Sequence, residues 1–291
     1  MITKMTDRLD TTSKPRLSRN LYRVVGLVGL TMLLSLILLA TFPQAVAPYD
    51  PGERVGRPFQ PPGPEFRLGT NDIGQDLLSE LIWGTRVSLF TGLLVGLVAA
   101  PLGTVVGLVS GYRSDVISVL LLRLVDLTLV LPFLPLVILL SAYVGQGQGK
   151  IILILVVVSW AAPARLIRSQ VLTVLNRPFI EAAQAIGSSD WRILRLHIWP
   201  SVRGLALVQF VLVGSASILA EASLSFLGLG DPSSKSWGTM LYFAQASGVF
   251  LSDAWRWWVL PAGLMITLSV LSLILVSYSL ERWSDPRLRA R

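Results

Sequence analysis

The sequence has no cysteine and a single histidine, His197. Without cysteine the chain can form neither a disulfide nor a thiolate centre, and the redox state of its compartment stays open. One histidine leaves almost no material for a histidine-based metal site or a Ser-His-Asp triad. His197 lies near an expected helix end, where an imidazole can bond terminal carbonyls, so we interpret it as structural. We therefore expect neither catalytic nor metal-binding residues.

A phosphate-binding loop is also missing. The stretch GQGQGK (145–150) tempts such an interpretation, but only three residues separate Gly145 from Gly149, and Ile151 stands where a P-loop needs Ser or Thr. We interpret it as a short external turn. Any role driven by ATP therefore requires separate ATPase subunits that bind ATP and Mg, and we expect no cofactor in this chain.

Charged residues are scarce as well. They make up 14% of the 291 residues, against about 25% in average soluble domains, while 53% are apolar and the mean hydropathy is +0.64. Continuous apolar runs are long enough for helices of about 20 residues that cross a bilayer, and they lack the alternation of a membrane barrel. We expect an all-α integral membrane protein with six transmembrane helices, at about 24–42, 88–110, 117–144, 151–168, 205–228 and 258–280.

The net charge of +8 is distributed unevenly. With the N-terminus inside, the inner segments hold 18 Lys and Arg and the outer ones hold 7. This is the positive-inside bias, so both termini are expected in the cytoplasm and no nucleic-acid partner is needed to explain the charge. The inner segments are 1–23, 111–123, 165–203 and 281–291, and the outer ones are 43–87, 145–150 and 229–257.

Polar stretches divide the chain further. We expect residues 1–23 to be a basic cytoplasmic tail that contacts anionic lipid, and 281–291 to be a second cytoplasmic tail. The helix at 24–42 is followed by Ala-Val-Ala, as at a signal-peptidase site, but its apolar run of about 18 residues is too long for a signal peptide. Residues 43–87 are expected to form an external linker that ends in an interfacial helix at 72–83.

Several helix features concern packing. Gly92 and Gly96, like Gly103 and Gly107, are four apart, which allows another helix to approach closely. Pro132 and Pro135 should kink the helix at 117–144. Arg123 and Asp126 lie three apart near its inner end, where they can form an ion pair. A role for that pair in transmitting motion is the alternative.

The most informative stretch is 181–200, EAAQAIGSSDWRILRLHIWP, between two apolar segments. A short helix opens on Glu181, Ala182 and Ala183 and ends at Gly187, which suits a position with positive φ. Ser188, Ser189 or Asp190 can cap a second amphipathic helix, which Pro200 should stop. This two-helix elbow is either an interfacial helix resting on lipid or, as we favour, a knob that inserts into a cytoplasmic partner.

The elbow resembles the EAA loop of permease subunits of binding-protein-dependent ABC importers: Glu-Ala-Ala, Gly six residues later, and Pro thirteen after that Gly. Three further segments resemble the dipeptide/oligopeptide/nickel branch, in its second, C-type permease: 66–89, 123–132 and 218–230, with 236–241 and 285–289 agreeing. Trp199 stands where the family usually has Leu, and Gln75-Asp76 where Arg-Asp is commoner.

The resemblance implies a type I ABC importer permease fold over 88–280, with the EAA loop at about 169–203. It implies that Glu181, Ala182, Ala183, Gly187, Ser188, Ser189 and Asp190 couple the chain to its ATPases. The implied partners are a second, B-type permease, two cytoplasmic ATPase subunits and an extracytoplasmic solute-binding protein. The implied setting is the bacterial cytoplasmic (inner) membrane, and dipeptides or oligopeptides are the favoured solutes.

Glu221 lies deep in the fifth apolar segment, which contains no Lys or Arg to pair with it. A carboxylate in that setting must face the bundle, a partner subunit or a wet pathway. With Ser217 and Ser225, we predict it to be a residue of the subunit interface or the pathway, and a protonated, inert carboxyl is the alternative.

Two other classes of function remain as rivals. A stand-alone secondary carrier should show inverted repeats and a midplane ion site, and the sequence has no convincing repeat. An intramembrane enzyme needs a catalytic set that the chain lacks. Nickel or another peptide-like solute stays open as an alternative cargo.

Overall fold

A computed structural model describes residues 19–284, and most of both predicted tails therefore lies outside the described residues. Within that range the chain is helical and has no β-strand, only an isolated bridge between Thr70 and Asp76. The α-helices, in chain order, are α1 (Arg19–Thr41), α2 (Pro43–Val46), α3 (Leu77–Tyr112), α4 (Val116–Val130), α5 (Phe133–Val144), α6 (Gln148–Ser159), α7 (Ala161–Leu175), α8 (Pro178–Ala185), α9 (Asp190–Ile193), α10 (Trp199–Phe226), α11 (Trp237–Ala246) and α12 (Trp255–Ser284).

Five of the helical stretches are long and apolar enough to cross a membrane. They are Val24–Thr41 in α1, all of α3, Gln148–Leu175 across α6 and α7, Asp190–Phe226 across α9 and α10, and Trp255–Glu281 in α12. The pair α4 and α5 makes a sixth span if the two are taken together. The expected all-helical membrane architecture is therefore confirmed.

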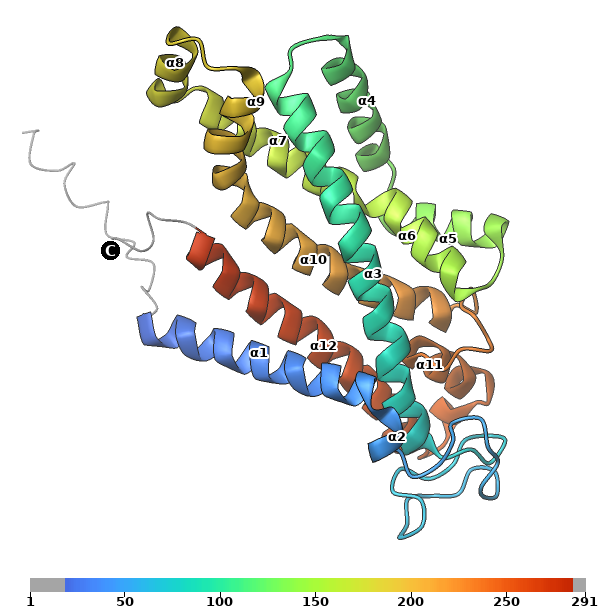
Figure 1. The fold of residues 1–291 in the computed structure, drawn as a ribbon. Helices are drawn as coiled ribbons and strands as arrows, with labels where there is room; N and C mark the ends of the chain where they lie inside the picture. The colour runs from blue at the N-terminus through green and yellow to red at the C-terminus, as the bar shows by residue number, and fades with distance from the viewer. Residues whose placement is uncertain (1–18, 285–291) are drawn as a thin grey trace, which may run out of the picture.

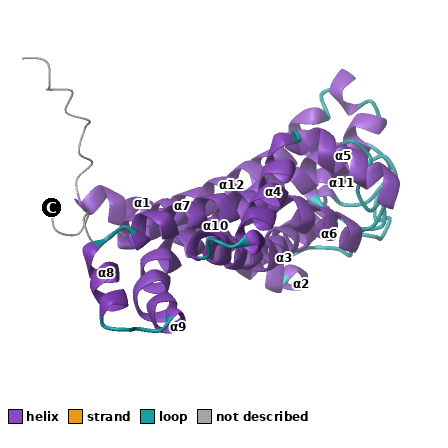
Figure 2. Cartoon of the chain, turned by 90° about the horizontal axis from the view of Figure 1, so that it is seen from above, coloured by secondary structure: helices purple, strands orange, loops and turns teal. Residues whose placement is uncertain are grey.

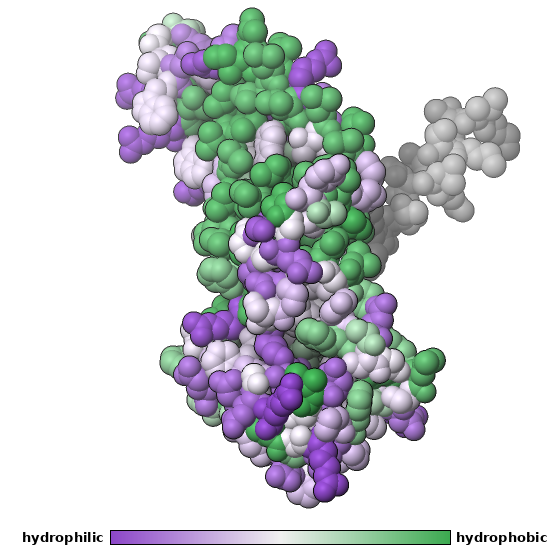
Figure 3. All heavy atoms as spheres, turned by 90° about the vertical axis from the view of Figure 1, so that its right-hand side faces the viewer, coloured by the Kyte–Doolittle hydropathy of each residue, from purple (hydrophilic) through white to green (hydrophobic). Residues whose placement is uncertain are grey.

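Polar and apolar residues separate along the bundle. Figure 3 shows one face with a broad apolar belt, hydrophilic residues at both ends, and some hydrophilic residues that reach into the belt. The segment joining α7 to α10 lies at one end, and the long loop of residues 47–76 lies at the opposite end (Figure 1). We call these the elbow end and the loop end.

The central helix α3 packs against α7 and α10 along most of its length. Its glycines are the reason for the close approach. A Cβ at Gly92 would lie 2.8 Å from the Gly214 carbonyl oxygen of α10, and one at Gly107 would lie 2.6 Å from the Ala164 oxygen of α7. The predicted packing role of these glycines is confirmed.

The separate interfacial helix expected at 72–83 does not form. The Asp76 side chain accepts a bond from the Ser79 amide at 2.8 Å and starts α3 at Leu77, which then continues through Tyr112. Leu77 and Glu80 are buried, because the loop-end segments pack over this first turn. Leu77 therefore lies in a buried helix start and is not part of a face that rests on the membrane surface.

The kink expected in the segment 117–144 is a complete break. α4 ends at Val130, and α5 turns away from it by 91°. Pro132 is the N-cap residue of α5, and its ring keeps the preceding residue extended. Pro135 falls in the first turn of α5, where a helix needs no amide donor, so its expected loss of a hydrogen bond does not occur.

Candidate functional site

The elbow consists of α8, a turn at residues 186–189, α9 and the π-helical turn η1 (Leu194–Ile198). Figure 2 shows α8 and α9 projecting from the side of the bundle near its elbow end. α8 begins at Pro178, which suits a first helical position because its missing amide would be unpaired there. Glu181 and Ala182 are exposed on α8, whereas Ala183 faces inward and is buried.

Gly187 ends α8 in the conformation predicted from the sequence. Its φ is +77°, its N–H donates to the Gln184 oxygen at 2.9 Å, and the Ser188 N–H donates to the Ala183 oxygen at 3.1 Å. These two bonds define a Schellman turn, in which a residue with a side chain at the glycine position is strained. The tip of the elbow is therefore fixed in shape.

Ser189 occupies the N-cap position of α9, although its side chain makes no capping bond. Asp190 has a different role: its Oδ1 accepts a hydrogen bond from the Tyr112 hydroxyl at 2.7 Å. Tyr112 is the last residue of α3. The elbow is thus attached to the end of the central helix as well as to its two flanking helices.

The inner face of the elbow is an apolar core, which we call the frame. Ile180, Ile193 and Ile198 are fully buried and pack with residues of α7, among them Ile167 and Val171. Burying an isoleucine contributes about 1.5–3 kcal/mol. With three such anchors, the elbow should move together with α7 and α10.

Pro200 does not stop the second helix, contrary to expectation. The turn η1 widens the helix, and the Trp199 N–H donates to the Leu194 oxygen, five residues earlier. This wider turn accommodates a proline, which lacks a donor, just inside α10. Residues Asp190–Phe226 therefore continue as one stretch from the elbow into the membrane span.

The outer face of the elbow is exposed and partly apolar. Ile186 at the tip is 83% exposed and Trp191 is 72% exposed, with Glu181 and Gln184 also on the surface. Large exposed apolar side chains within a polar surround are typical of a protein contact. His197 packs within the elbow, where the centroid of its ring lies 5.8 Å from that of Phe179 in α8.

Glu221 lies far from the elbow, inside the bundle. It is 3% exposed, and its carboxylate accepts bonds from the Ser225 hydroxyl at 2.8 Å and the Ser88 hydroxyl of α3 at 3.3 Å. Ser217 instead donates to the Val213 oxygen. The structure thus joins Glu221 to Ser225 and Ser88, whereas Ser217 is not part of this group. In this chain the Glu221 side chain faces the interior of the helix bundle, which is one of the three surroundings expected for it.

The ion pair expected between Arg123 and Asp126 is not formed in the described chain. Asp126 pairs with Arg165 of α7 at 2.6 Å, because α4 packs against α7 there. Both side chains are about half exposed, at 46% and 58%. The pair lies on the surface of two helices of the membrane bundle, and Arg165 is ten residues before the end of α7.

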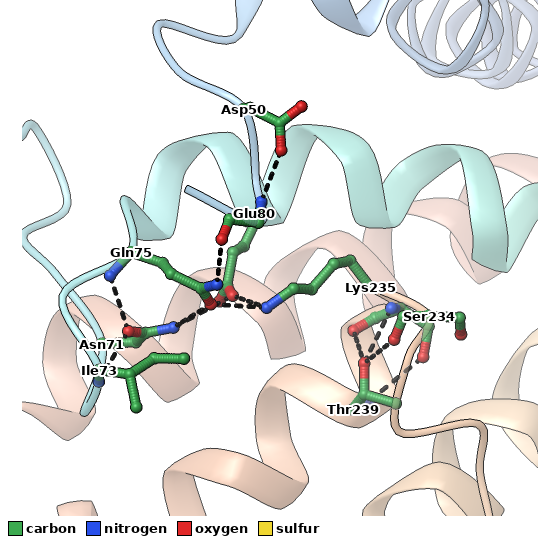
Figure 4. Close-up of polar contacts among 10 residues, drawn as sticks. Asp50, Asn71, Ile73, Gln75, Glu80, Ser234, Lys235 and Thr239 are labelled. Atoms are coloured by element: carbon green, nitrogen blue, oxygen red, sulfur yellow. Dashed lines mark hydrogen bonds and ion pairs between the residues drawn. The ribbon is translucent and has the colours of Figure 1, made fainter. Parts of the chain in front are cut away.

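A buried polar network at the loop end was not predicted (Figure 4). Lys235, which precedes α11, forms an ion pair with Glu80 of α3 and donates to the Gln75 amide oxygen at 2.7 Å. Asn71 donates to the same Glu80 oxygen at 3.1 Å. Lys235 and Glu80 are 155 residues apart in the sequence, so their spacing gave no indication that they pair.

Comparison with known proteins agrees with this architecture. Residues 103–290 match the family described as binding-protein-dependent transport system inner membrane component. The di/tripeptide transport system permease protein DppC of Pseudomonas aeruginosa is 37% identical over 273 residues, with 91% of this chain and 88% of that protein covered.

Two further relatives have similar coverage. The dipeptide transport system permease protein DppC of Bacillus subtilis is 32% identical, over 91% of this chain and 82% of its own length. The glutathione transport system permease protein GsiD of Pectobacterium atrosepticum is 34% identical, over 90% and 86%. With a family match over most of its length and these relatives, the chain belongs to the inner membrane permease components of binding-protein-dependent transport systems.

Proposed function

We propose that the chain is one of two membrane subunits of an ATP-driven importer for dipeptides or oligopeptides. The support is that the relatives named above carry di/tripeptide and dipeptide transport in their names. A glutathione permease among them keeps other peptide-like solutes as the runner-up, and nickel remains a further alternative. The partners would be a second permease, two ATPase subunits and an extracytoplasmic binding protein.

The observation that carries the coupling role is the construction of the elbow. A fixed Schellman tip with exposed Ile186 and Trp191 stands on a buried apolar frame. A groove on an ATPase subunit that held the tip would displace the frame as a body, and with it α7 and α10. Asp190 would pass part of that displacement to α3 through Tyr112.

In this proposal ATP binding and hydrolysis happen on the partner subunits. Closure of the two ATPases can bias the access state of the membrane subunits only if the ATPases bind one state more tightly than the other. The elbow is the element through which that difference acts. This chain contributes the coupling element and one half of the solute pathway, and its partners bind ATP and Mg.

The exposed pair of Asp126 and Arg165 supports a pathway face. A charged side chain within a membrane helix is costly where it faces lipid, and it usually faces the bundle interior or water. Two half-exposed charges on α4 and α7 therefore favour water or the second permease over lipid as their surroundings. We place the solute pathway along this face, between the two permeases.

The charge distribution supports one orientation. Lys and Arg concentrate on the segments at the elbow end and at both termini, so the elbow end would face the cytoplasm. The loop of 47–76 would then meet the binding protein outside. The membrane would be the bacterial cytoplasmic one.

Reconstitution tests the proposal. The permease pair in proteoliposomes, with ATPase subunits and binding protein, should accumulate a labelled dipeptide only when ATP is present on the elbow side. Uptake by this chain alone, without ATPase subunits, would identify a secondary carrier instead. Uptake of Ni²⁺ but of no dipeptide would leave the permease assignment and overturn the solute.

A further inference from the structure

An apolar groove with a volume of about 510 Å³ lies between the end of α3 and the second half of the elbow. Its walls are almost entirely apolar and include Leu108 and Val109 of α3 and Leu194 of η1. Two arginines, Arg113 and Arg195, also line it. Of the residues that line the groove, Trp191 and Tyr112 also take part in the proposed coupling.

The groove lies where a membrane surface would be. By length and composition, Leu77–Tyr112 and Asp190–Phe226 can each cross a membrane, and the groove lies at the elbow-side ends of both stretches. Trp191 and Trp199 both line the groove and are exposed, and tryptophan collects at the boundary between hydrocarbon and headgroups. The apolar walls thus belong to the hydrocarbon side and the arginines to the headgroup side.

The charges near the groove favour an anion. Arg195 forms no ion pair with any residue of the described chain, and Arg113 pairs only with Asp115, at 3.3 Å and in an exposed setting where such a pair contributes little. The two nearby carboxylates line an adjoining polar hollow that shares Tyr112 and Arg113 with the groove: Asp190 is bonded to Tyr112, and Asp115 caps α4. Two arginines remain to face the groove, and a guanidinium matches a phosphate in geometry.

The geometry points to a binding site for an anionic phospholipid, with an acyl chain between Leu108, Val109 and Leu194 and the phosphate held by Arg113 and Arg195. A lipid in this site would fill the angle between α3 and the elbow. It would therefore support the same junction that the bond between Tyr112 and Asp190 closes. The inference requires the elbow end to lie at a membrane surface and is independent of the solute.

Native mass spectrometry of the purified full-length chain tests the site, with phosphatidylglycerol and phosphatidylcholine as probes. Phosphatidylglycerol should be retained preferentially, and Arg195→Gln should weaken its binding about fivefold, the effect of one basic residue near a membrane surface. The matched control is Arg203→Gln: this arginine is also exposed, lies two turns further along the same stretch and does not line the groove. It should bind like the wild type.

A second variant tests the acyl-chain part. Val105→Trp should fill the groove, whose wall Val105 forms, and reduce the retention of phosphatidylglycerol while leaving both arginines in place. Equal binding of the two lipids, or equal loss in the Arg195 and Arg203 variants, would overturn the proposal.

A photo-crosslink in the assembled transporter identifies what fills the groove in the membrane. The chain has no cysteine, so Val109→Cys gives this chain one attachment point for a benzophenone maleimide. A lipid adduct is the expected product. A crosslink to the second permease would show that protein, and no lipid, occupies the groove, and would overturn the proposal without affecting the assignment as an importer.

Discussion

The hydroxyl of Tyr112, at the end of α3, donates a 2.7 Å hydrogen bond to Asp190, the first residue of α9. The two residues are 78 positions apart and join the central helix to the elbow. This bond is the one side-chain hydrogen bond between these two elements in the described chain. It gives the elbow a third attachment in addition to its two chain connections.

Removing that hydroxyl should weaken coupling without unfolding the protein. Tyr112→Phe loses a hydrogen bond in an exposed setting, which contributes about 0.5–1.5 kcal/mol, so ATP-driven uptake should fall about threefold. Tyr143→Phe is the control, because Tyr143 is exposed and carries no such link. Uptake and ATPase activity in proteoliposomes measure the effect, and equal uptake by both variants would exclude a role for the bond.

Substitution of Gly187 should be unfavourable because of its backbone conformation, and not because a side chain would lack space. A Cβ on Gly187 meets nothing within 4 Å, and the same is true of Gly149, but only Gly187 has a positive φ. Gly187→Ala should therefore strain the turn by about 1–2 kcal/mol and lower affinity for the ATPase. Gly149→Ala, in the first turn of α6, should be neutral or slightly stabilising. Co-purification of the ATPase with each variant provides the comparison.

Breaking the loop-end ion pair should destabilise the fold. Lys235→Met leaves the Glu80 carboxylate buried without its cation, and removal of one partner from a buried pair costs about 3–5 kcal/mol. The lower end applies, since Lys235 is 23% exposed. Thermal unfolding of the purified chain measures this loss.

Two further variants show whether the cost comes from the stranded charge. The double variant Glu80→Gln with Lys235→Met should recover much of the lost stability, because no charge is left unpaired. Lys150→Met, at an exposed lysine of the same end, should unfold like the wild type. A double variant as unstable as the single one would contradict the explanation.

On the proposed pathway face, Asp126 should be accessible to water. Asp126→Cys should react with a membrane-impermeant thiol reagent, whereas Leu127→Cys should react slowly, as it is one position along α4 on a face about 100° away. In the isolated chain the Asp126 side chain is half exposed and Leu127 is more exposed, so accessibility alone does not predict faster labelling at Asp126. Equal labelling of the two in the assembled transporter would remove Asp126 from the pathway.

The sequence predicted those features that local chemistry determines. The positive φ of Gly187 and the close helix approach at Gly92 and Gly107 follow from glycine itself, and the spans follow from length and apolarity. The pairings of Asp126 with Arg165 and Glu80 with Lys235 were missed because each joins residues that only the packing of distant helices brings together.

The differences at prolines have a related cause. Pro132 and Pro200 were both expected to disturb a helix, but the size of the disturbance depends on neighbouring backbone. At Pro132 the chain breaks at 91°, whereas at Pro200 a π-turn absorbs the missing donor and the helix continues. Whether Glu221, Ser217 and Ser225 act at a subunit interface or in the pathway stays a prediction.

The most direct test of the central claim is a crosslink from the elbow tip. Ile186→Cys places a thiol on the most exposed apolar side chain of the tip. With a short bifunctional reagent, in membranes that contain the whole transporter, it should join this chain to an ATPase subunit in a nucleotide-dependent yield. A tip that is labelled only from the extracytoplasmic side, or that never crosslinks to an ATPase while uptake is intact, would contradict the account.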